Sequence, residues 1–196
     1  KTSYFTRCGS DTKNVNDFCH IFKSTKNIDD TWSIPERIKL FADTINEGQP
    51  YLTPDENELY FVSDSKDGYG GRDIYFAQLM PDGSWGNVKN LGPEINTKFD
   101  EDAPFVHSDG KTLFFASTGH NTIGGYDIFR SEFKQGAWST PYNVGKPVNT
   151  AQDDKFYVVS SDGERGYYSS EKKDGFGQQD IYMVEPGLFG KPTALV

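Results

Sequence analysis

The chain has 196 residues, a net charge of −9 and a hydrophobic content of 35%. This acidic balance argues against a nucleic-acid partner, because phosphate contacts need clustered lysine or arginine, and the one basic pair, Lys172-Lys173, is flanked by acids. No apolar run is long enough to span a bilayer. The first residues, 1–5, read as a strand and not as a signal peptide.

One short phrase, an acidic residue followed by isoleucine and an aromatic residue, recurs along the chain. Its isoleucines stand at 21, 74, 128 and 181, so the steps are 53, 54 and 53 residues. In the first copy, His20 replaces the acid. A constant period of this length indicates a repeat protein, whose units bury their apolar faces against one another. We expect a single domain, 1–196, with repeats over about 1–47, 48–101, 102–154 and 155–196.

The elements within each repeat follow a fixed order. An apolar strand comes after a turn such as Asp109-Gly110, which favours a hairpin. A glycine-rich loop leads into the Asp-Ile-Tyr strand, and a tryptophan and then an Asn-Thr phrase follow. In the third repeat this order predicts strands near 103–107, 111–117, 126–133 and 141–145.

Four strands in about 50 residues correspond to one blade of a β-propeller. The expected fold class is therefore all-β, a propeller of four-stranded blades. Because the first repeat begins at the second strand of a blade, the domain is expected to be incomplete at its N-terminus. About 3.75 blades are then present, and we expect them to form part of a larger ring.

Two stretches carry a resemblance to a known family. The phrase from Ser108 to Ser117, followed by Gly124–Phe129, resembles WD40-like propeller repeats of the TolB type. The longer phrase from Trp138 to Thr150 looks like the propellers of Bacteroidetes envelope proteins, which are often joined to tetratricopeptide repeats and an OmpA-like peptidoglycan-binding domain.

This resemblance implies a non-enzymatic protein-interaction scaffold, periplasmic and associated with the outer membrane. It also implies partners among envelope proteins, including subunits of the type IX secretion system, or a role in anchoring the outer membrane to peptidoglycan. The alternatives are a propeller that binds a glycan or small ligand, and an accessory propeller of a hydrolase.

The recurring aspartates and tryptophans invite a functional interpretation, but their even spacing favours a structural one. We expect the aspartates to accept backbone N–H bonds in the glycine-rich turns, with a bound cation as the alternative. We expect the tryptophans to pack one blade against the next, with a ligand platform as the alternative. These structural repeat residues are Asp73, Asp127, Asp180, Trp32, Trp85 and Trp138.

Two acidic runs precede the first strands of the third and fourth repeats. In a propeller, the loops that lead into the innermost strands lie on one face near the central channel, where recurring acids could attract a basic partner or a cation. The alternative is a solvated turn with capping aspartates. The candidate partner-facing acids are Asp100, Glu101, Asp102, Asp153 and Asp154.

The only cysteines, Cys8 and Cys19, flank one predicted hairpin in the first repeat. Their Cα atoms could lie about 5.5 Å apart, which suits a disulfide, although two free thiols are the alternative. A bridge would indicate an oxidising compartment, hence the periplasm or the cell surface.

No set of residues supports catalysis or metal binding. The three histidines, His20, His107 and His120, share no metal-ligand spacing, and no nucleophile elbow is present. The five arginines fall at unrelated repeat positions, unlike the arginine cluster of a sialidase site. We expect no catalytic residue, no metal and no cofactor.

Overall fold

The computed structural model describes residues 1–9, 18–173 and 175–185, and this part of the chain is all β-strand and loop. Its strands pair into four antiparallel sheets in chain order. No described segment forms a helix that could cross a bilayer. The sheets contain β1 (Thr2–Cys8), β2 (Cys19–Thr25) and β3 (Glu36–Arg37); β4 (Glu47–Leu52), β5 (Glu58–Ser63), β6 (Asp73–Leu79) and β7 (Trp85–Asn90); β8 (Glu101–Val106), β9 (Thr112–Ser117), β10 (Asp127–Lys134), β11 (Ala137–Trp138) and β12 (Tyr142–Asn143); and β13 (Asp154–Val159), β14 (Gly166–Ser170) and β15 (Asp180–Val184).

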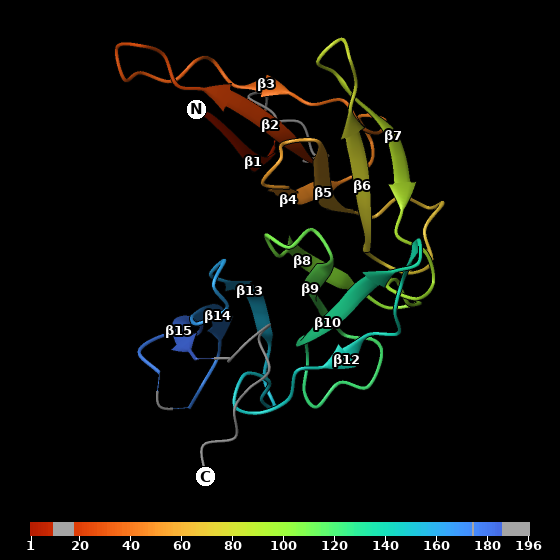
Figure 1. The fold of residues 1–196 in the computed structure, drawn as a ribbon, viewed down its shortest axis with the longest axis vertical. Helices are drawn as coiled ribbons and strands as arrows, with labels where there is room; N and C mark the ends of the chain where they lie inside the picture. Colours follow the sequence, from red (N-terminus) through yellow and green to blue (C-terminus); the bar gives the residue numbers. More distant parts are fainter. Residues whose placement is uncertain (10–17, 174, 186–196) are drawn as a thin grey trace.

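The four sheets are the blades of a β-propeller and lie around an arc (Figure 1). Strand β8 contacts both β4 and β13 near the centre of the arc, and later strands of each blade lie progressively further out. The predicted all-β fold of four-stranded blades is confirmed. In the third blade, however, the outermost strand is split into β11 and β12, and Pro141 between them has no N–H to donate to the ladder.

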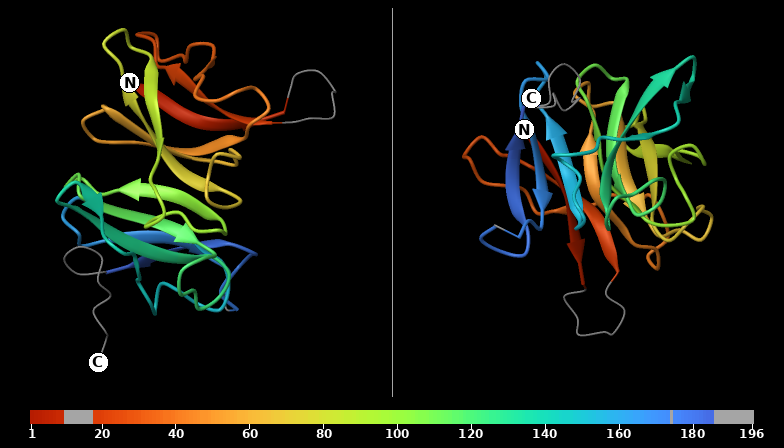
Figure 2. Two further views of the ribbon diagram at one scale, coloured as in Figure 1. Left: turned by 90° about the vertical axis from the view of Figure 1, so that its right-hand side faces the viewer. Right: turned by 90° about the horizontal axis from the view of Figure 1, so that it is seen from below.

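The blades stack face to face, as the two views of Figure 2 show. Three apolar clusters fill the junctions between successive blades. In β9, Leu113 and Phe115 pack towards the second blade, whereas Phe114 and Ala116 pack towards the fourth. Both faces of this strand are covered, so all six of its residues are buried and its sequence is mostly apolar without alternation.

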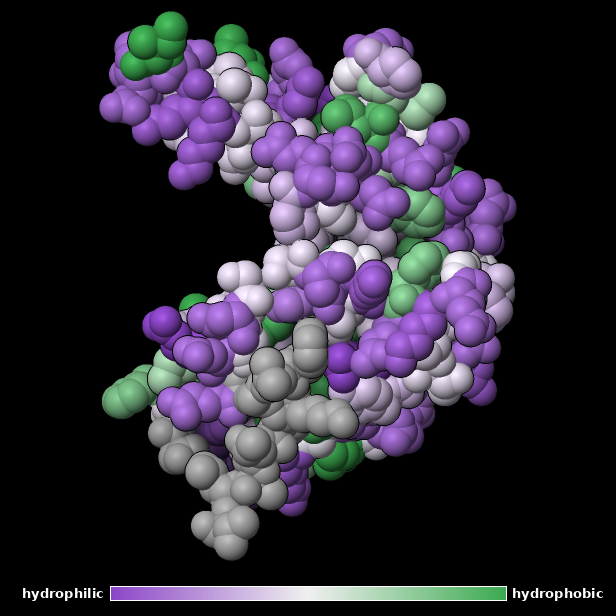
Figure 3. Space-filling view, viewed as in Figure 1, coloured by the Kyte–Doolittle hydropathy of each residue, from purple (hydrophilic) through white to green (hydrophobic). Residues whose placement is uncertain are grey.

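The centre of the arc is open to solvent. The space-filling view shows a hollow between the first and fourth blades, within a face that is mostly hydrophilic (Figure 3). The innermost strands border this hollow, and their side chains therefore determine what the centre of the propeller can bind.

Candidate functional site

The recurring aspartates close the glycine-rich loops of their own blades. Asp73 is buried and accepts N–H bonds from Tyr69 at 2.5 Å and Gly70 at 3.1 Å. Asp127 and Asp180 accept equivalent bonds in the third and fourth blades. The structure thus places these three aspartates as acceptors for turn backbone and brings none of them to the channel.

A second set of contacts, which we call the inter-blade clasp, joins each glycine-rich loop to the next blade. Asp100 accepts the Arg72 N–H at 2.9 Å, and the Glu101 N–H donates to the Arg72 carbonyl at 2.8 Å. Asp153 accepts the Tyr126 N–H at 2.9 Å in the same way at the following junction. Both aspartates are half-buried and act between blades.

Three of the five candidate partner-facing acids are buried, which corrects the prediction for them. Glu101 accepts bonds from the N–H and hydroxyl of Thr97 at 2.8 Å and from the hydroxyl of Ser117 at 2.7 Å. Asp154 accepts the equivalent bonds from Thr150, and Asp102 is also enclosed. These hydrogen bonds hold the carboxyl groups of Glu101 and Asp154 within their own blades, so they face the protein and not a partner.

The tryptophans do not all have the same surroundings. Trp85 makes an edge contact with Tyr4 of the first blade, with ring centroids 6.1 Å apart, and Trp138 packs on the cluster between the second and third blades. Trp32 is 47% exposed and belongs to none of the core clusters of the described residues. Among the described residues, Trp32 therefore does not take part in the predicted packing between blades.

The innermost strands share an unusual backbone conformation. A bulge interrupts each of β4, β8 and β13, and its residue has a positive φ: Gln49 at 52°, Ala103 at 49° and Phe156 at 56°. Together with β1 they line a channel of about 420 Å³. Phe156 and Val158 remain 43% and 41% exposed there, whereas burial raises the pKa of the neighbouring Tyr51 to about 12.

A charged network lies beside the channel and spans three blades. The Arg72 guanidinium donates to the Tyr126 hydroxyl at 2.7 Å and lies 3.3 Å from an Asp102 carboxylate oxygen. Lys155 approaches the same oxygen to 3.8 Å, and its ammonium lies 3.6 Å from the centre of the Tyr126 ring. Burial raises the pKa of Tyr126 to about 12 against the opposing effect of Arg72, so its hydroxyl remains protonated.

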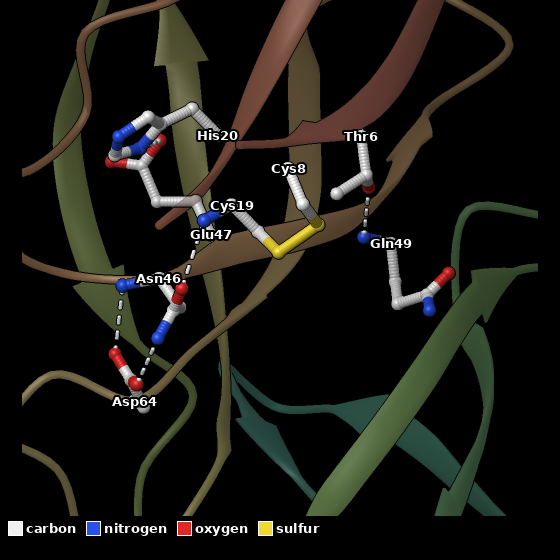
Figure 4. The surroundings of a disulfide bond; sticks show 8 residues. All are labelled: Thr6, Cys8, Cys19, His20, Asn46, Glu47, Gln49 and Asp64. Carbon is white, nitrogen blue, oxygen red and sulfur yellow. Dashed lines mark hydrogen bonds and ion pairs between the residues drawn. A yellow bond between two sulfur atoms is a disulfide. The ribbon is translucent and has the colours of Figure 1, made fainter. Parts of the chain in front are cut away.

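Cys8 and Cys19 form the predicted disulfide, joining directly paired residues of β1 and β2 with Cα atoms 3.9 Å apart. Figure 4 shows its surroundings: Asn46 accepts the Cys19 N–H at 2.8 Å and is itself bound to Asp64. The Cys19–Asn46 bond is the inter-blade clasp of the first junction. A cleft of about 360 Å³ borders the disulfide and reaches Arg72, and it meets the channel at residues shared by both.

Near the disulfide, His20 faces Glu47 of the second blade, with 3.9 Å between Nδ1 and Oε2 (Figure 4). Burial lowers the pKa of His20, and Arg37 lowers it further. Burial also raises the pKa of Glu47. Both shifts favour the neutral form, so this contact is weaker than a charged pair would be.

Sequence reasoning missed the channel and its charged network. Arg72 and Tyr126 both stand immediately before a repeated aspartate, yet their side chains differ in chemistry. The bulge residues Gln49, Ala103 and Phe156 likewise share one backbone position but differ in side chain. A side chain that varies among equivalent positions of the repeat was the signal in the sequence that could have pointed to the channel.

Within the described ranges, no group of three or more His, Cys, Asp or Glu side chains is arranged to hold a metal ion.

No family model matches this chain, and no curated protein matches it. Among solved structures, it is similar to a TolB-like protein from Agrobacterium tumefaciens (TM-score 0.58, 16% identity), with coverage of 86% of this chain and 53% of that one. It is also similar to an endo-arabinase from Bacteroides thetaiotaomicron (TM-score 0.58, 18% identity), with coverage of 93% of this chain and 70% of that one. A third similar structure is an α-L-arabinofuranosidase from Lactobacillus brevis (TM-score 0.60, 14% identity), with coverage of 97% of this chain and 70% of that one.

These likenesses show that the fold is a β-propeller. The chain spans about half the length of the TolB-like protein.

Proposed function

We propose that this chain is a non-enzymatic protein-interaction scaffold of the bacterial cell envelope, and that the channel is its partner-binding surface. The observation that carries the proposal is the bulge shared by β4, β8 and β13. Its backbone is the same in three blades, but its side chain is Gln49, Ala103 or Phe156. Since the fold does not require a particular side chain at the bulge, we infer that recognition of a partner selects the three side chains. Unfavourable φ values, such as those of the bulge residues, are commonly retained at functional sites.

The envelope location rests on separate support. A disulfide persists in oxidising compartments such as the periplasm, and a structural neighbour is a TolB-like protein. The resemblance to Bacteroidetes envelope propellers extends the proposal to type IX secretion, or to anchoring of the outer membrane to peptidoglycan. PorE, which combines a propeller with an OmpA-like domain, is an example of that layout.

The test is recovery of a protein partner from cross-linked envelope extract by the wild-type chain and by Phe156→Ala. This exposed ring is expected to act as an anchor, so its truncation should reduce recovery by about tenfold or more. Phe176→Ala, at an exposed phenylalanine outside the channel, serves as the matched control and should recover the partner normally. Equal recovery by both variants, or no partner at all, contradicts the proposal.

The alternative is a glycan-binding propeller or an accessory propeller of a hydrolase. Two structural neighbours, an endo-arabinase and an α-L-arabinofuranosidase, favour it only through their fold. Saturable binding of an arabinan oligosaccharide that Phe156→Ala abolishes would support this alternative in place of the protein scaffold.

A further inference from the structure

A cleft of about 740 Å³ lies away from the channel, at the outer edge of the third blade. The turn at 109–112 forms one wall. The outward end of β10, at the right of Figure 1, and the turn that follows it form the other. This volume is within the usual range for small-molecule sites. The side chains that matter below are Asp109, Lys111, Arg130, Glu132, Phe133 and Lys134.

A buried arginine forms part of the cleft wall. Arg130 is almost fully enclosed, and its guanidinium donates to the Tyr142 hydroxyl at 2.5 Å and to Glu132 at 2.7 Å. Lys134 pairs with the other oxygen of Glu132. This hydrogen bond from Lys134 is the main cause of the lowered pKa of Glu132, so the carboxylate stays ionised between two cations.

The opposite wall supplies a third cation. Lys111 is exposed and forms no ion pair with any residue in the described ranges. The adjacent Asp109 is engaged by its own turn, accepting the N–H groups of Lys111 at 2.8 Å and Thr112 at 2.9 Å and the Thr112 hydroxyl at 2.7 Å. Three cations therefore face two carboxylates, in a protein whose net charge is −9.

The second blade shows that the fold does not require these charges. A smaller cleft of about 430 Å³ occupies the same place there, between the 55–58 turn and the end of β6. The pairing of Glu58 with Gln78 corresponds to that of Thr112 with Glu132. By this register, the positions of Lys111, Arg130 and Lys134 are taken in the second blade by Asn57, Phe76 and Met80.

An aromatic ring completes the third-blade cleft. Phe133 is 41% exposed, and its ring packs edge-on against Trp138 at 5.2 Å, which holds it in place. An exposed aromatic face beside cationic groups suits a ligand with an apolar ring face and an anionic substituent.

We propose that this cleft binds an anionic saccharide, a sugar that carries a carboxylate or a phosphate group. The anionic group contacts Lys111 and the Arg130–Lys134 wall, and the sugar ring lies against Phe133. No residue lines both this cleft and the channel, so the site does not depend on the protein-binding function proposed above.

Calorimetric titration of the intact chain with glucuronate, glucose 6-phosphate and glucose tests this proposal. At least one anionic sugar is expected to bind about tenfold or more tightly than glucose, and the stronger of the two identifies the anionic group. Its affinity should fall as salt is raised. The double variant Lys111→Asn/Lys134→Met, which copies the second blade, should lose about tenfold or more.

Lys66→Asn, an exposed lysine outside the cleft, is the matched control and should bind like wild type. Thermal unfolding of each variant checks that the fold is intact. Equal binding of glucose and both anions, unchanged affinity in the double variant, or no saturable binding of any sugar would overturn the proposal.

Discussion

Replacing Gly70 by alanine is expected to open the junction between the second and third blades. A Cβ atom at this position would lie 2.1 Å from the Phe99 carbonyl oxygen and 2.4 Å from that of Thr97. Both are backbone atoms, so no side-chain rotation can relieve the contact. The 97–99 segment must move, and it carries the residues that lead into the inter-blade clasp.

The cost follows from the hydrogen bonds that this movement breaks. The Gly71 N–H donates to the Phe99 carbonyl at 3.0 Å, and the two clasp bonds between Arg72 and residues 100 and 101 lie next to it. Each such bond stabilises the fold by about 1 kcal/mol net, so the loss of all three predicts a decrease of about 3 kcal/mol in the free energy of unfolding.

Two further glycine variants provide a graded comparison in urea denaturation. In Gly71→Ala the Cβ would meet only a carboxylate oxygen of Asp100, at 2.2 Å, and that side chain can rotate away at a cost of about 1 kcal/mol. In Gly83→Ala no atom lies within 4 Å, but φ is 81°, which costs about 1 kcal/mol. If Gly70→Ala is no less stable than Gly83→Ala, the argument that backbone approach closes the junction is refuted.

Three other perturbations test separate parts of the structure. Removing the disulfide by Cys8→Ser should lower the free energy of unfolding by about 2–3 kcal/mol, and reductant should do the same to wild type only; a midpoint insensitive to reductant would contradict this. Asn149→Ala leaves the Ile128 N–H, now bound at 2.8 Å, without its acceptor and should cost about 2–3 kcal/mol in denaturation; a loss below about 0.5 kcal/mol would show that water replaces the amide. Burial raises the pKa of Glu101, so the stability from its protonated form is lost as pH rises, and wild type should weaken relative to Glu101→Gln over a range that begins at about pH 4.3, the usual pKa of glutamate. Denaturation across that range checks it, and a difference that does not change with pH would argue against the assignment.

The blade architecture was predictable because its signal is periodic. The strands predicted near 103–107, 111–117 and 126–133 agree with β8, β9 and β10 to within two residues at each end. Apolar strands and glycine turns recur at a fixed spacing, and any one blade therefore supports the prediction for the others. The disulfide was predictable for a similar reason, since both cysteines align with the two sides of one repeat hairpin.

The candidate site was less predictable because the spacing of a recurring acid does not show whether its carboxylate is buried or exposed. Glu101 and Asp100 are adjacent acids, but the first is buried by Thr97 and Ser117 and the second reaches back to the preceding blade. Only contacts across the junction separate these roles. The cations of the outer cleft were missed for the opposite reason, because they are the residues that the repeat does not share.

The clasp has a consequence for how such a chain can change over evolution. Its bonds join residues 27, 28 and 27 positions apart at three successive junctions, so every junction is built from the same short-range set of partners. Duplication or deletion of one period of the sequence would therefore create no new type of boundary. A lineage could alter the size of its propeller in single-blade steps, while each existing blade kept its neighbours and its side chains facing the centre.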